Sequence, residues 1–464
     1  MALWHSALAA GKRRDLSVAI RSGKIRVVVG ARSAIFAPVK QLGLLVVDEE
    51  HEPTYKQEDR VRYHARDLAV VRGKLTKSTV ILGSATPSFE TRERAREGRY
   101  TTALLNKKIS QSGEPKIELI DLTSTPLVDL TQAPLAQESL KAIQDTIDAG
   151  QQAMIYLNRR GFAAFLLCSD CGDVQNCEEC SISLTVHKQS CKLRCHVCAF
   201  EKKIPDFCSK CQGTNLQAMG AGIESLEFDL PRLLNGARIA RLDRDQITSA
   251  KRLNETLEEF RSGKSNILIG TQMLVKGHDF PGVTLVLVVL ADALFRWPDF
   301  RAPERAYQVL KQLAGRSGRG ELSGRVLVQT YDQDHVVLQV LDGRLSETSF
   351  LEEERDLRKV IGYPPFVRLA RLRFESGSRE DSIQRSREVA QALSRTLPHQ
   401  EEAKQLEILG PSEAFLERAK GLYRWDILIK SKDIQLLHKT ISFAQNMCNQ
   451  KKWNFLIDID PYGV

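Results

Sequence analysis

Leu44-Leu45-Val46-Val47-Asp48-Glu49-Glu50-His51 joins a short apolar run directly to three acidic residues and a histidine. An apolar run without polar alternation predicts a strand of a parallel sheet that is buried on both faces. Ligands of such sheets bind at the carboxyl ends of the strands, where Asp48 and Glu49 stand. A lone acidic pair is more often a solvated loop, so its meaning depends on the rest of the chain.

Further apolar runs of the same kind alternate with helical patterns, which predicts α/β architecture with parallel strands. We expect these strands at Ile25–Val29, Val80–Leu82, Ala153–Leu157, Ile239–Leu242, Ile267–Ile269, Thr284–Leu290 and Val326–Gln329.

The chain is predicted to contain two such α/β lobes and a third domain. A polar stretch with several Gly and Pro residues over 106–135 predicts a linker between lobe 1 (1–105) and lobe 2 (136–345). Residues 346–464 are expected to form a small α+β domain. Its strands are predicted at Arg368–Phe374, Leu406–Leu409, Trp425–Ile429 and Trp453–Ile459, and its helices at Ser378–Thr396 and Asp433–Cys448.

The composition sets limits on partners and compartment. The net charge of +9 favours polyanionic partners without establishing nucleic acid as one. No apolar run is long enough to span a membrane, so no membrane partner is expected. The first residues lack the basic and apolar segments of a secretory signal, and a cytoplasmic location is the default expectation.

Eight of the 10 cysteines form four C-x-x-C pairs inside lobe 2, over 168–213. Two such pairs can complete the tetrahedral thiolate shell that Zn²⁺ prefers. The spacing predicts one ion shared by Cys177, Cys180, Cys195 and Cys198, and a second shared by Cys168, Cys171, Cys208 and Cys211. Closed four-cysteine sites have a structural role, and iron–sulfur clusters are the rival occupant.

Four motifs follow in order along the chain: Asp48-Glu49-Glu50-His51, Gly83-Ser84-Ala85-Thr86-Pro87, Gly270-Thr271-Gln272-Met273 with Lys276-Gly277-His278-Asp279, and Gln312-Leu313-Ala314-Gly315-Arg316-Ser317-Gly318-Arg319. Together they resemble motifs II, III, V and VI of superfamily 2 helicases. With two zinc sites inserted after Asn158-Arg159-Arg160-Gly161-Phe162, and Leu456-Ile457-Asp458-Ile459-Asp460-Pro461 near the end, the chain resembles the PriA family of bacterial primosomal replication-restart DNA helicases. The resemblance implies two RecA-like lobes, the first incomplete.

The resemblance also implies site residues. ATP with Mg²⁺ would be handled by a catalytic set of Asp48, Glu49, His51, Gln312, Arg316 and Arg319, with Arg319 as the arginine finger. Ser84, Thr86, Gly277 and Asp279 would couple nucleotide binding to the interlobe contacts. DNA contacts are expected from Arg32, Tyr55, Lys56, Arg62, Tyr63, His64, Arg66, Thr271 and Gln272, in part on an aromatic-rich loop. Val61 stands where an aromatic residue is expected, and a solvated basic loop is the alternative.

A phosphate-binding loop of the form G-x-x-x-x-G-K-[ST] is not found in this sequence. Gly11-Lys12 has Ser6 in place of the first glycine and Arg13 in place of the hydroxyl residue. Lobe 1 is therefore expected to lack its opening strand, to expose apolar strand faces and to turn over ATP poorly. A truncated gene or mis-set start and a separately encoded amino-terminal part both explain this.

The resemblance implies a 3′-to-5′ DNA helicase that binds forked and single-stranded DNA and restarts stalled replication forks. It also implies single-stranded DNA-binding protein and other primosome proteins as partners. A non-catalytic, zinc-dependent scaffold that binds forks is the alternative from another class, and an RNA-dependent superfamily 2 ATPase is a third.

Overall fold

The computed structural model divides into two compact units. Unit 1 comprises Met1–Thr102 and Asp458–Gly463, and unit 2 comprises Ala103–Ile457. The structure describes residues 1–5, 8–59, 61–105, 115–128, 134–158, 165–180, 182–187, 192–219, 223–243, 246–247, 249–275, 280–318, 323–396 and 405–463.

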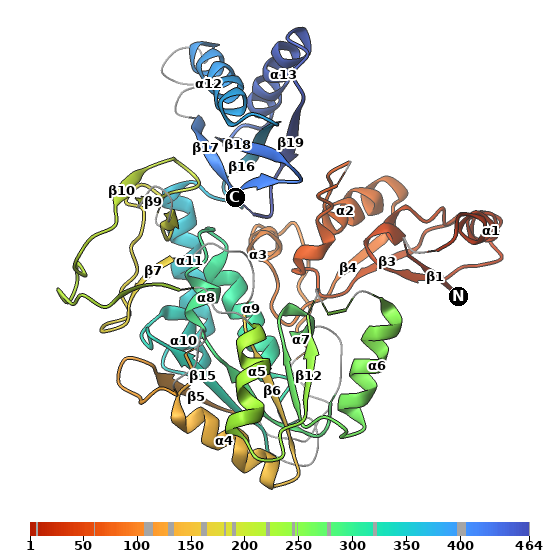
Figure 1. Cartoon of the computed structure of the whole chain (residues 1–464). Coiled ribbons are helices and arrows are strands. Elements are labelled where there is room, and N and C mark those ends of the chain that lie inside the picture. The colour runs from red at the N-terminus through yellow and green to blue at the C-terminus, as the bar shows by residue number, and fades with distance from the viewer. Residues whose placement is uncertain are drawn as a thin grey trace. The chain divides into compact units, whose positions relative to one another are not determined.

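Unit 1 contains two separate pairs of parallel strands with helices beside them (Figure 1). Its elements are β1 (Ala2–Trp4) paired with β2 (Val28–Gly30), β3 (Leu44–Val47) paired with β4 (Thr79–Leu82), helices α1 (Ala10–Arg21), α2 (Ala65–Thr76) and α3 (Phe89–Arg96), and the 3₁₀ turns η1 (Arg32–Phe36) and η2 (Pro53–Tyr55). Gly73 of α2 lies so close to β4 that an added Cβ would be 2.3 Å from Val80 Cγ2, so this contact requires glycine.

Both strand pairs of unit 1 carry apolar side chains that are open to solvent. Leu3, Val29, Leu44, Val46 and Ile81 are between 48% and 62% exposed. Parallel strands are normally covered on both faces. The expectation of exposed apolar strand faces in lobe 1 is therefore confirmed.

Unit 2 is built on a six-stranded, entirely parallel sheet in the order β12-β13-β6-β14-β15-β5. The strands are β5 (Lys116–Asp121), β6 (Gln152–Tyr156), β12 (Ile239–Leu242), β13 (Ile267–Gly270), β14 (Val283–Val288) and β15 (Arg325–Thr330). The accompanying helices are α4 (Gln137–Asp148), α5 (Ile223–Leu233), α6 (Ala250–Arg261), α7 (Gln272–Val275), α8 (Asp292–Phe295), α9 (Ala302–Ala314), α10 (Val336–Leu341) and α11 (Glu347–Ile361).

Helices cover both faces of this sheet, and alternate strand residues enter two cores. Ile155 and Leu287 pack on the side of α4 and α5. Met154 and Val286 pack on the opposite side with Phe260 of α6 and with α9 and α10. Burial on both faces explains why the strands lack polar alternation in the sequence.

A cysteine-rich module is inserted after β6. Its five-stranded sheet has the order β10-β9-β8-β7-β11. The strands are β7 (Phe165–Cys168), β8 (Thr185–His187), β9 (Lys192–Arg194), β10 (Glu201–Lys203) and β11 (Leu216–Met219). The module shares an apolar cluster with Phe300, Tyr363, Val367 and Leu428, so it packs against the lobe and the carboxyl-terminal domain.

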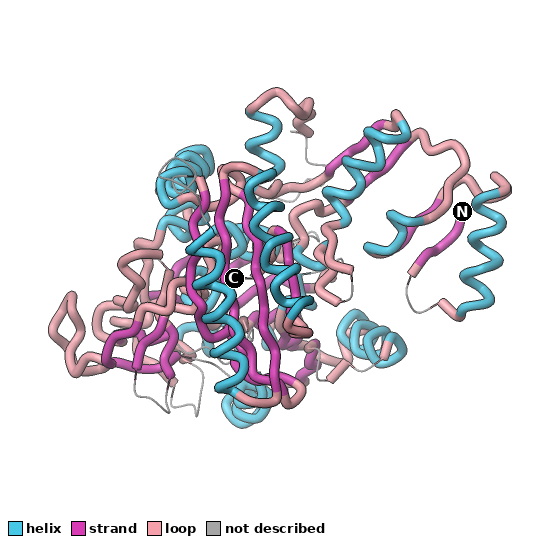
Figure 2. Tube along the Cα trace, turned by 90° about the horizontal axis from the view of Figure 1, so that it is seen from above, coloured by secondary structure: helices cyan, strands magenta, loops and turns pink. Residues whose placement is uncertain are grey.

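The carboxyl-terminal domain has a four-stranded sheet in the order β17-β18-β16-β19. Its two helices lie side by side against the sheet (Figure 2). The elements are β16 (Arg368–Ser376), α12 (Arg379–Thr396), β17 (Leu406–Ala419), β18 (Leu422–Ser431), α13 (Ile434–Gln450) and β19 (Phe455–Ile459). Asp433 caps α13 by accepting hydrogen bonds from the backbone N–H groups of Gln435 and Leu436.

The structure differs from one of the predicted boundaries. The linker expected over 106–135 contains β5, whose six residues pair with β15 as the edge strand of the lobe 2 sheet. Asp458–Gly463 cluster with unit 1, although Asp458 and Ile459 belong to β19 of the domain expected over 346–464. Neither the β5 pairing nor the contacts of Asp458–Gly463 leave a local signal in the sequence. None of the described helices combines the length and the apolar composition of a membrane-spanning segment.

Candidate functional site

The turn after β3 presents two acidic side chains to solvent and fixes the next two residues in the interior. Asp48 and Glu49 are exposed, whereas Glu50 is fully buried and His51 is 5% exposed. Glu49 has a φ of 47°, a left-handed conformation that is unfavourable for a residue with a Cβ. The backbone N–H of Glu49 donates to Asp48 Oδ1 at 3.0 Å. The turn thus separates an exposed carboxylate pair from a buried pair.

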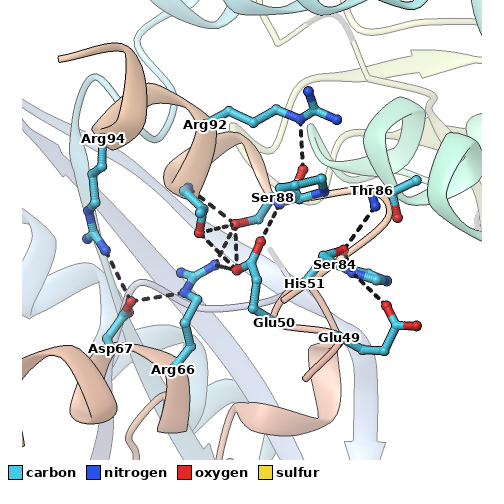
Figure 3. A network of polar contacts seen from close by, with 12 residues as sticks. Glu49, Glu50, His51, Arg66, Asp67, Ser84, Thr86, Ser88, Arg92 and Arg94 are labelled. Atoms are coloured by element: carbon cyan, nitrogen blue, oxygen red, sulfur yellow. Dashed lines mark hydrogen bonds and ion pairs between the residues drawn. The ribbon is translucent and has the colours of Figure 1, made fainter. Parts of the chain in front are cut away.

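The histidine of this turn connects it to the segment after β4. The His51 ring Nδ1 lies 2.6 Å from Ser84 Oγ, and Ser84 Oγ accepts a hydrogen bond from the Thr86 N–H at 2.9 Å (Figure 3). Glu49 Oε2 lies 3.6 Å from the same ring nitrogen. The structure therefore brings together Glu49, His51, Ser84 and Thr86, which were predicted from two separate motifs.

Glu50 is the centre of a buried polar network that the sequence reasoning missed. One carboxylate oxygen accepts from the Ser88 N–H at 2.6 Å. The other accepts from Ser88 Oγ at 3.1 Å, Thr91 Oγ1 at 2.9 Å and Arg66 Nη1 at 3.1 Å (Figure 3). Arg66 is also paired with Asp67 at 3.1 Å. The third acidic residue of the motif thus ties the strand end to α2 and to the start of α3.

The segment between His51 and α2 carries most of the predicted DNA contacts. Arg32 donates hydrogen bonds to the carbonyl oxygens of Thr54, at 3.0 Å, and Lys56. The hydroxyl of Tyr55 donates to the Asp48 carbonyl at 2.8 Å. Burial, followed by the charge of Asp48, raises the pKa of Tyr55. These bonds hold the segment against the acidic turn.

Tyr63 and Arg62 are half-buried, and the Tyr63 ring meets Phe36 edge to face at 5.1 Å. Val61, which stands where an aromatic residue was expected, is 77% exposed.

Three of the predicted DNA contacts lie in the interior instead. Lys56 is 5% exposed, His64 8% and Arg66 2%. Burial lowers the pKa of His64 to about 3, so its ring is neutral near pH 7. A buried lysine or arginine already paired with a carboxylate cannot meet a phosphate without leaving that partner. The expectation of DNA contacts by these three residues is therefore corrected, and they hold the segment in place.

The predicted site residues of lobe 2 that the structure describes lie at or just after the carboxyl ends of its strands and helices. Thr271 and Gln272 are half-buried at the carboxyl end of β13. Gln312 lies in the last turn of α9, and Arg316 follows that helix and donates to the Val275 carbonyl at 2.6 Å. The remaining predicted residues of this lobe, Gly277, Asp279 and Arg319, lie outside the described residues.

Within the described part of the chain, two groups of side chains have the geometry of a metal site. They are Cys168, Cys171, Cys208 and Cys211, and Cys177, Cys180, Cys195 and Cys198, with the sulfur atoms of each group within 4.8 Å of one another. The predicted pairing of the four C-x-x-C units is confirmed.

The sulfur positions fit zinc. Across the pairs, Cys168 and Cys211 sulfurs are 3.6 Å apart, as are those of Cys177 and Cys198. A tetrahedral shell with Zn–S bonds of about 2.3 Å has sulfurs about 3.8 Å apart. The backbone N–H of Gly213 points to the sulfur of Cys211 at 3.4 Å, as expected for a thiolate acceptor.

Three of the knuckles share one backbone turn. The residue after the second cysteine is Gly172, Ala199 or Gln212, with φ of 72°, 66° and 61°. In each case its N–H donates to the carbonyl of the first cysteine, at 2.8, 3.1 and 3.0 Å. The repeated turn directs both thiols of a knuckle toward one point. The two four-cysteine groups are therefore zinc-binding sites.

Three family models match this chain. Residues 177–203 match the PriA DNA helicase Cys-rich region (CRR) domain, and residues 201–321 match the Helicase conserved C-terminal domain. Residues 359–462 match the Primosomal protein N C-terminal domain. The first of these matches falls on the zinc module and the last on the carboxyl-terminal α+β domain.

Curated relatives extend the similarity to the whole chain. The Replication restart protein PriA of Bacillus subtilis (strain 168) is 36% identical over 100% of this chain and 57% of its own length. The protein of the same name from Rickettsia felis is 37% identical over 99% of this chain and 69% of its own length. That from Haemophilus influenzae is 37% identical over 99% of the chain and 62% of its length. The chain thus spans a little over half of the first relative and about two thirds of the others, and it belongs to the PriA family of replication restart proteins.

Proposed function

We propose that the chain is the motor and zinc-binding part of an ATP-dependent 3′-to-5′ DNA helicase that restarts stalled replication forks. The observation that carries this proposal is the link between the acidic turn and the segment after β4 through His51 and Ser84, in a chain of PriA family membership. Forked and single-stranded DNA are the proposed substrates. Single-stranded DNA-binding protein and other primosome proteins are the proposed partners, and the cytoplasm is the proposed location.

The exposed carboxylates of Asp48 and Glu49 are proposed to take part in the hydrolysis of ATP bound with Mg²⁺. The bound ion would neutralise phosphate charge during phosphoryl transfer. Asp48, at the carboxyl end of β3, would hold it, and Glu49 would orient the attacking water. Arg316 and Arg319 are proposed to bring positive charge from the other lobe, with Gln312, Gly277 and Asp279 at the interlobe contacts.

The proposed DNA surface of unit 1 consists of Arg32, Tyr55, Arg62 and Tyr63. Aromatic rings stack on unpaired bases, and guanidinium groups meet phosphates. Thr271 and Gln272 are proposed to contact DNA from lobe 2.

ATP turnover by these 464 residues is proposed to be weak, because no segment matches a phosphate-binding loop. Gly263-Lys264-Ser265 comes nearest in composition, but it follows the carboxyl end of α6, whereas phosphate groups bind at helix amino termini.

The test is DNA-stimulated ATP hydrolysis by the chain and by a version extended at its amino terminus to the length of the relatives. We expect turnover only in the extended version, abolished there by Glu49→Gln. Robust turnover by the 464-residue chain would refute the proposed dependence on a phosphate-binding loop. Stimulation by RNA in place of forked DNA would refute the proposed substrate.

A zinc-dependent scaffold is the second candidate, favoured by the packing of the zinc module against both neighbouring domains. It predicts fork binding that survives Glu49→Gln and is lost on chelation of zinc, with no ATP turnover in either version of the chain.

A further inference from the structure

The last residues of the chain enclose the side chain of Lys56. Its ammonium lies 2.8 Å from Asp458 Oδ1, and both side chains are 4% exposed. It also donates hydrogen bonds to the carbonyls of Ile459 at 2.6 Å and Asp460 at 3.1 Å. Three oxygens of one short segment therefore surround the charge. All of these residues belong to unit 1.

The same segment makes a second contact beside the first. The ring of Tyr462 lies 5.0 Å from the ring of His64, measured between centroids. Lys56 and His64 face one another in an isolated antiparallel bridge, so the two contacts hold both sides of that bridge. We call Glu52–His64 the post-motif loop. Arg32 holds the loop at another point through the Thr54 and Lys56 carbonyls.

Because Lys56 and Asp458 are buried, we expect their contact to be either fully formed or fully broken. A buried charge that loses its partner is strongly unfavourable, so departure of the terminal segment would force Lys56 toward water. The residue next to Lys56 is Tyr55, whose hydroxyl is bonded to the Asp48 carbonyl. Movement of Lys56 would therefore disturb the turn that carries the exposed carboxylates.

We propose that Asp458–Tyr462 is a latch that positions the post-motif loop, with Lys56 and Asp458 as the positioning residues. The latch holds Tyr55 against Asp48 while the exposed side of the loop remains available to single-stranded DNA. Binding of DNA to the loop then changes the conformation of the terminal segment. Release of the terminal segment changes the conformation of the acidic turn. The DNA-responsive part of this inference rests on the proposed function, whereas the latch itself does not.

The test is amide hydrogen exchange of the 464-residue chain, followed by mass spectrometry. In Lys56→Met, we expect exchange to accelerate together in the post-motif loop and in residues 458–463, by at least about 150-fold if the buried pair contributes as such pairs usually do. Lys56→Arg should restore most of the protection because it keeps the charge. The control Lys74→Met removes an exposed lysine of α2 and should change exchange by less than about twofold.

Asp458→Asn tests the pair from the other side and leaves residues 1–102 intact, which keeps the test usable if Lys56→Met does not fold. Acceleration in the terminal segment alone, or in neither segment, would overturn the latch.

Addition of a single-stranded oligonucleotide distinguishes a latch that responds to DNA from a contact that only stabilises the fold. In the wild type, protection should change in both the loop and the terminal segment, and in Asp458→Asn in the loop alone. A wild type in which only the loop responds would overturn the coupling. Absence of any binding would count against the proposed function, while the exchange data without DNA still decide the latch.

Discussion

Replacement of Glu50 by glutamine should open the first unit locally. Glu50 is fully buried, and its two oxygens accept four hydrogen bonds. Glutamine has nearly the same shape but offers one accepting oxygen and two donors. If that oxygen faces Arg66, Ser88 Oγ and Thr91, the new NH₂ group faces the Ser88 N–H, donor against donor.

The magnitude follows from the lost charge and the lost acceptor. Removal of one member of a buried ion pair destabilises a protein by about 3–5 kcal/mol. Arg66 keeps Asp67 as a partner at 3.1 Å, and that carboxylate is 38% exposed, so the compensation is partial. We therefore expect the lower end, about 3 kcal/mol, which corresponds to a roughly 150-fold change in a local opening equilibrium.

The assay is hydrogen exchange of the amides in α2 and in residues 83–96, because one free energy of unfolding is not defined for a chain of several domains. Glu49→Gln is the matched control, since its side chain is 49% exposed. That variant should shift protection by less than about 0.5 kcal/mol. Equal protection in Glu50→Gln and Glu49→Gln would refute the view that Glu50 joins these elements.

Three further outcomes are expected. Cys168→Ser and Cys180→Ser should each lower the zinc content from two ions to one per chain, measured by atomic emission, because the two thiols belong to different sites. The pKa of His64 is lowered from 6.5 to about 3, chiefly by burial. Unfolded chains take up a proton below pH 6.5 that the folded unit does not, so unit 1 should lose about 2 kcal/mol at pH 5, and His64→Phe should remove that part of the pH dependence of hydrogen exchange in unit 1. Phe260→Ala should lower the hydrogen-exchange protection of lobe 2 by about 3–5 kcal/mol, because this ring is fully buried in the lobe 2 core and meets Phe280 edge to face.

The parallel strands could be predicted because burial on both faces leaves continuous apolar runs. Leu44–Val47 and Ile239–Leu242 have the predicted bounds, and the other predicted strands of the two lobes shift by a few residues at one or both ends. β5 was missed because it is an edge strand with alternating charged residues, Lys116-Ile117-Glu118-Leu119, in a stretch flanked by Gly and Pro. Its pairing with β15 depends on residues about 200 positions away, for which periodicity gives no signal.

The zinc pairing could be predicted because C-x-x-C spacing is a local consequence of knuckle geometry. Burial of charged residues could not. Lys56 and Arg66 sit among polar residues in the sequence, and only the distant Asp458 and Ser88 reveal that their charges are enclosed. Glu50 belongs to the predicted acidic motif, yet nothing in the motif distinguishes a carboxylate that holds the fold from one that binds a metal.

Adjacent side chains of the acidic turn lie in opposite environments, because Asp48 and Glu49 are exposed whereas Glu50 and His51 are buried. This division has a physical reason. A carboxylate that holds Mg²⁺ and water, as we propose for Asp48 and Glu49, has to remain accessible, so it cannot also be the group that fixes the turn. Glu50 and His51 fix the turn from the protein interior through their contacts with Arg66, Ser88 and Ser84. The change from exposed to buried side chains follows Glu49, where the backbone is left-handed. Variants of the exposed pair should therefore alter chemistry with little change in stability, and variants of the buried pair should alter the geometry on which that chemistry depends.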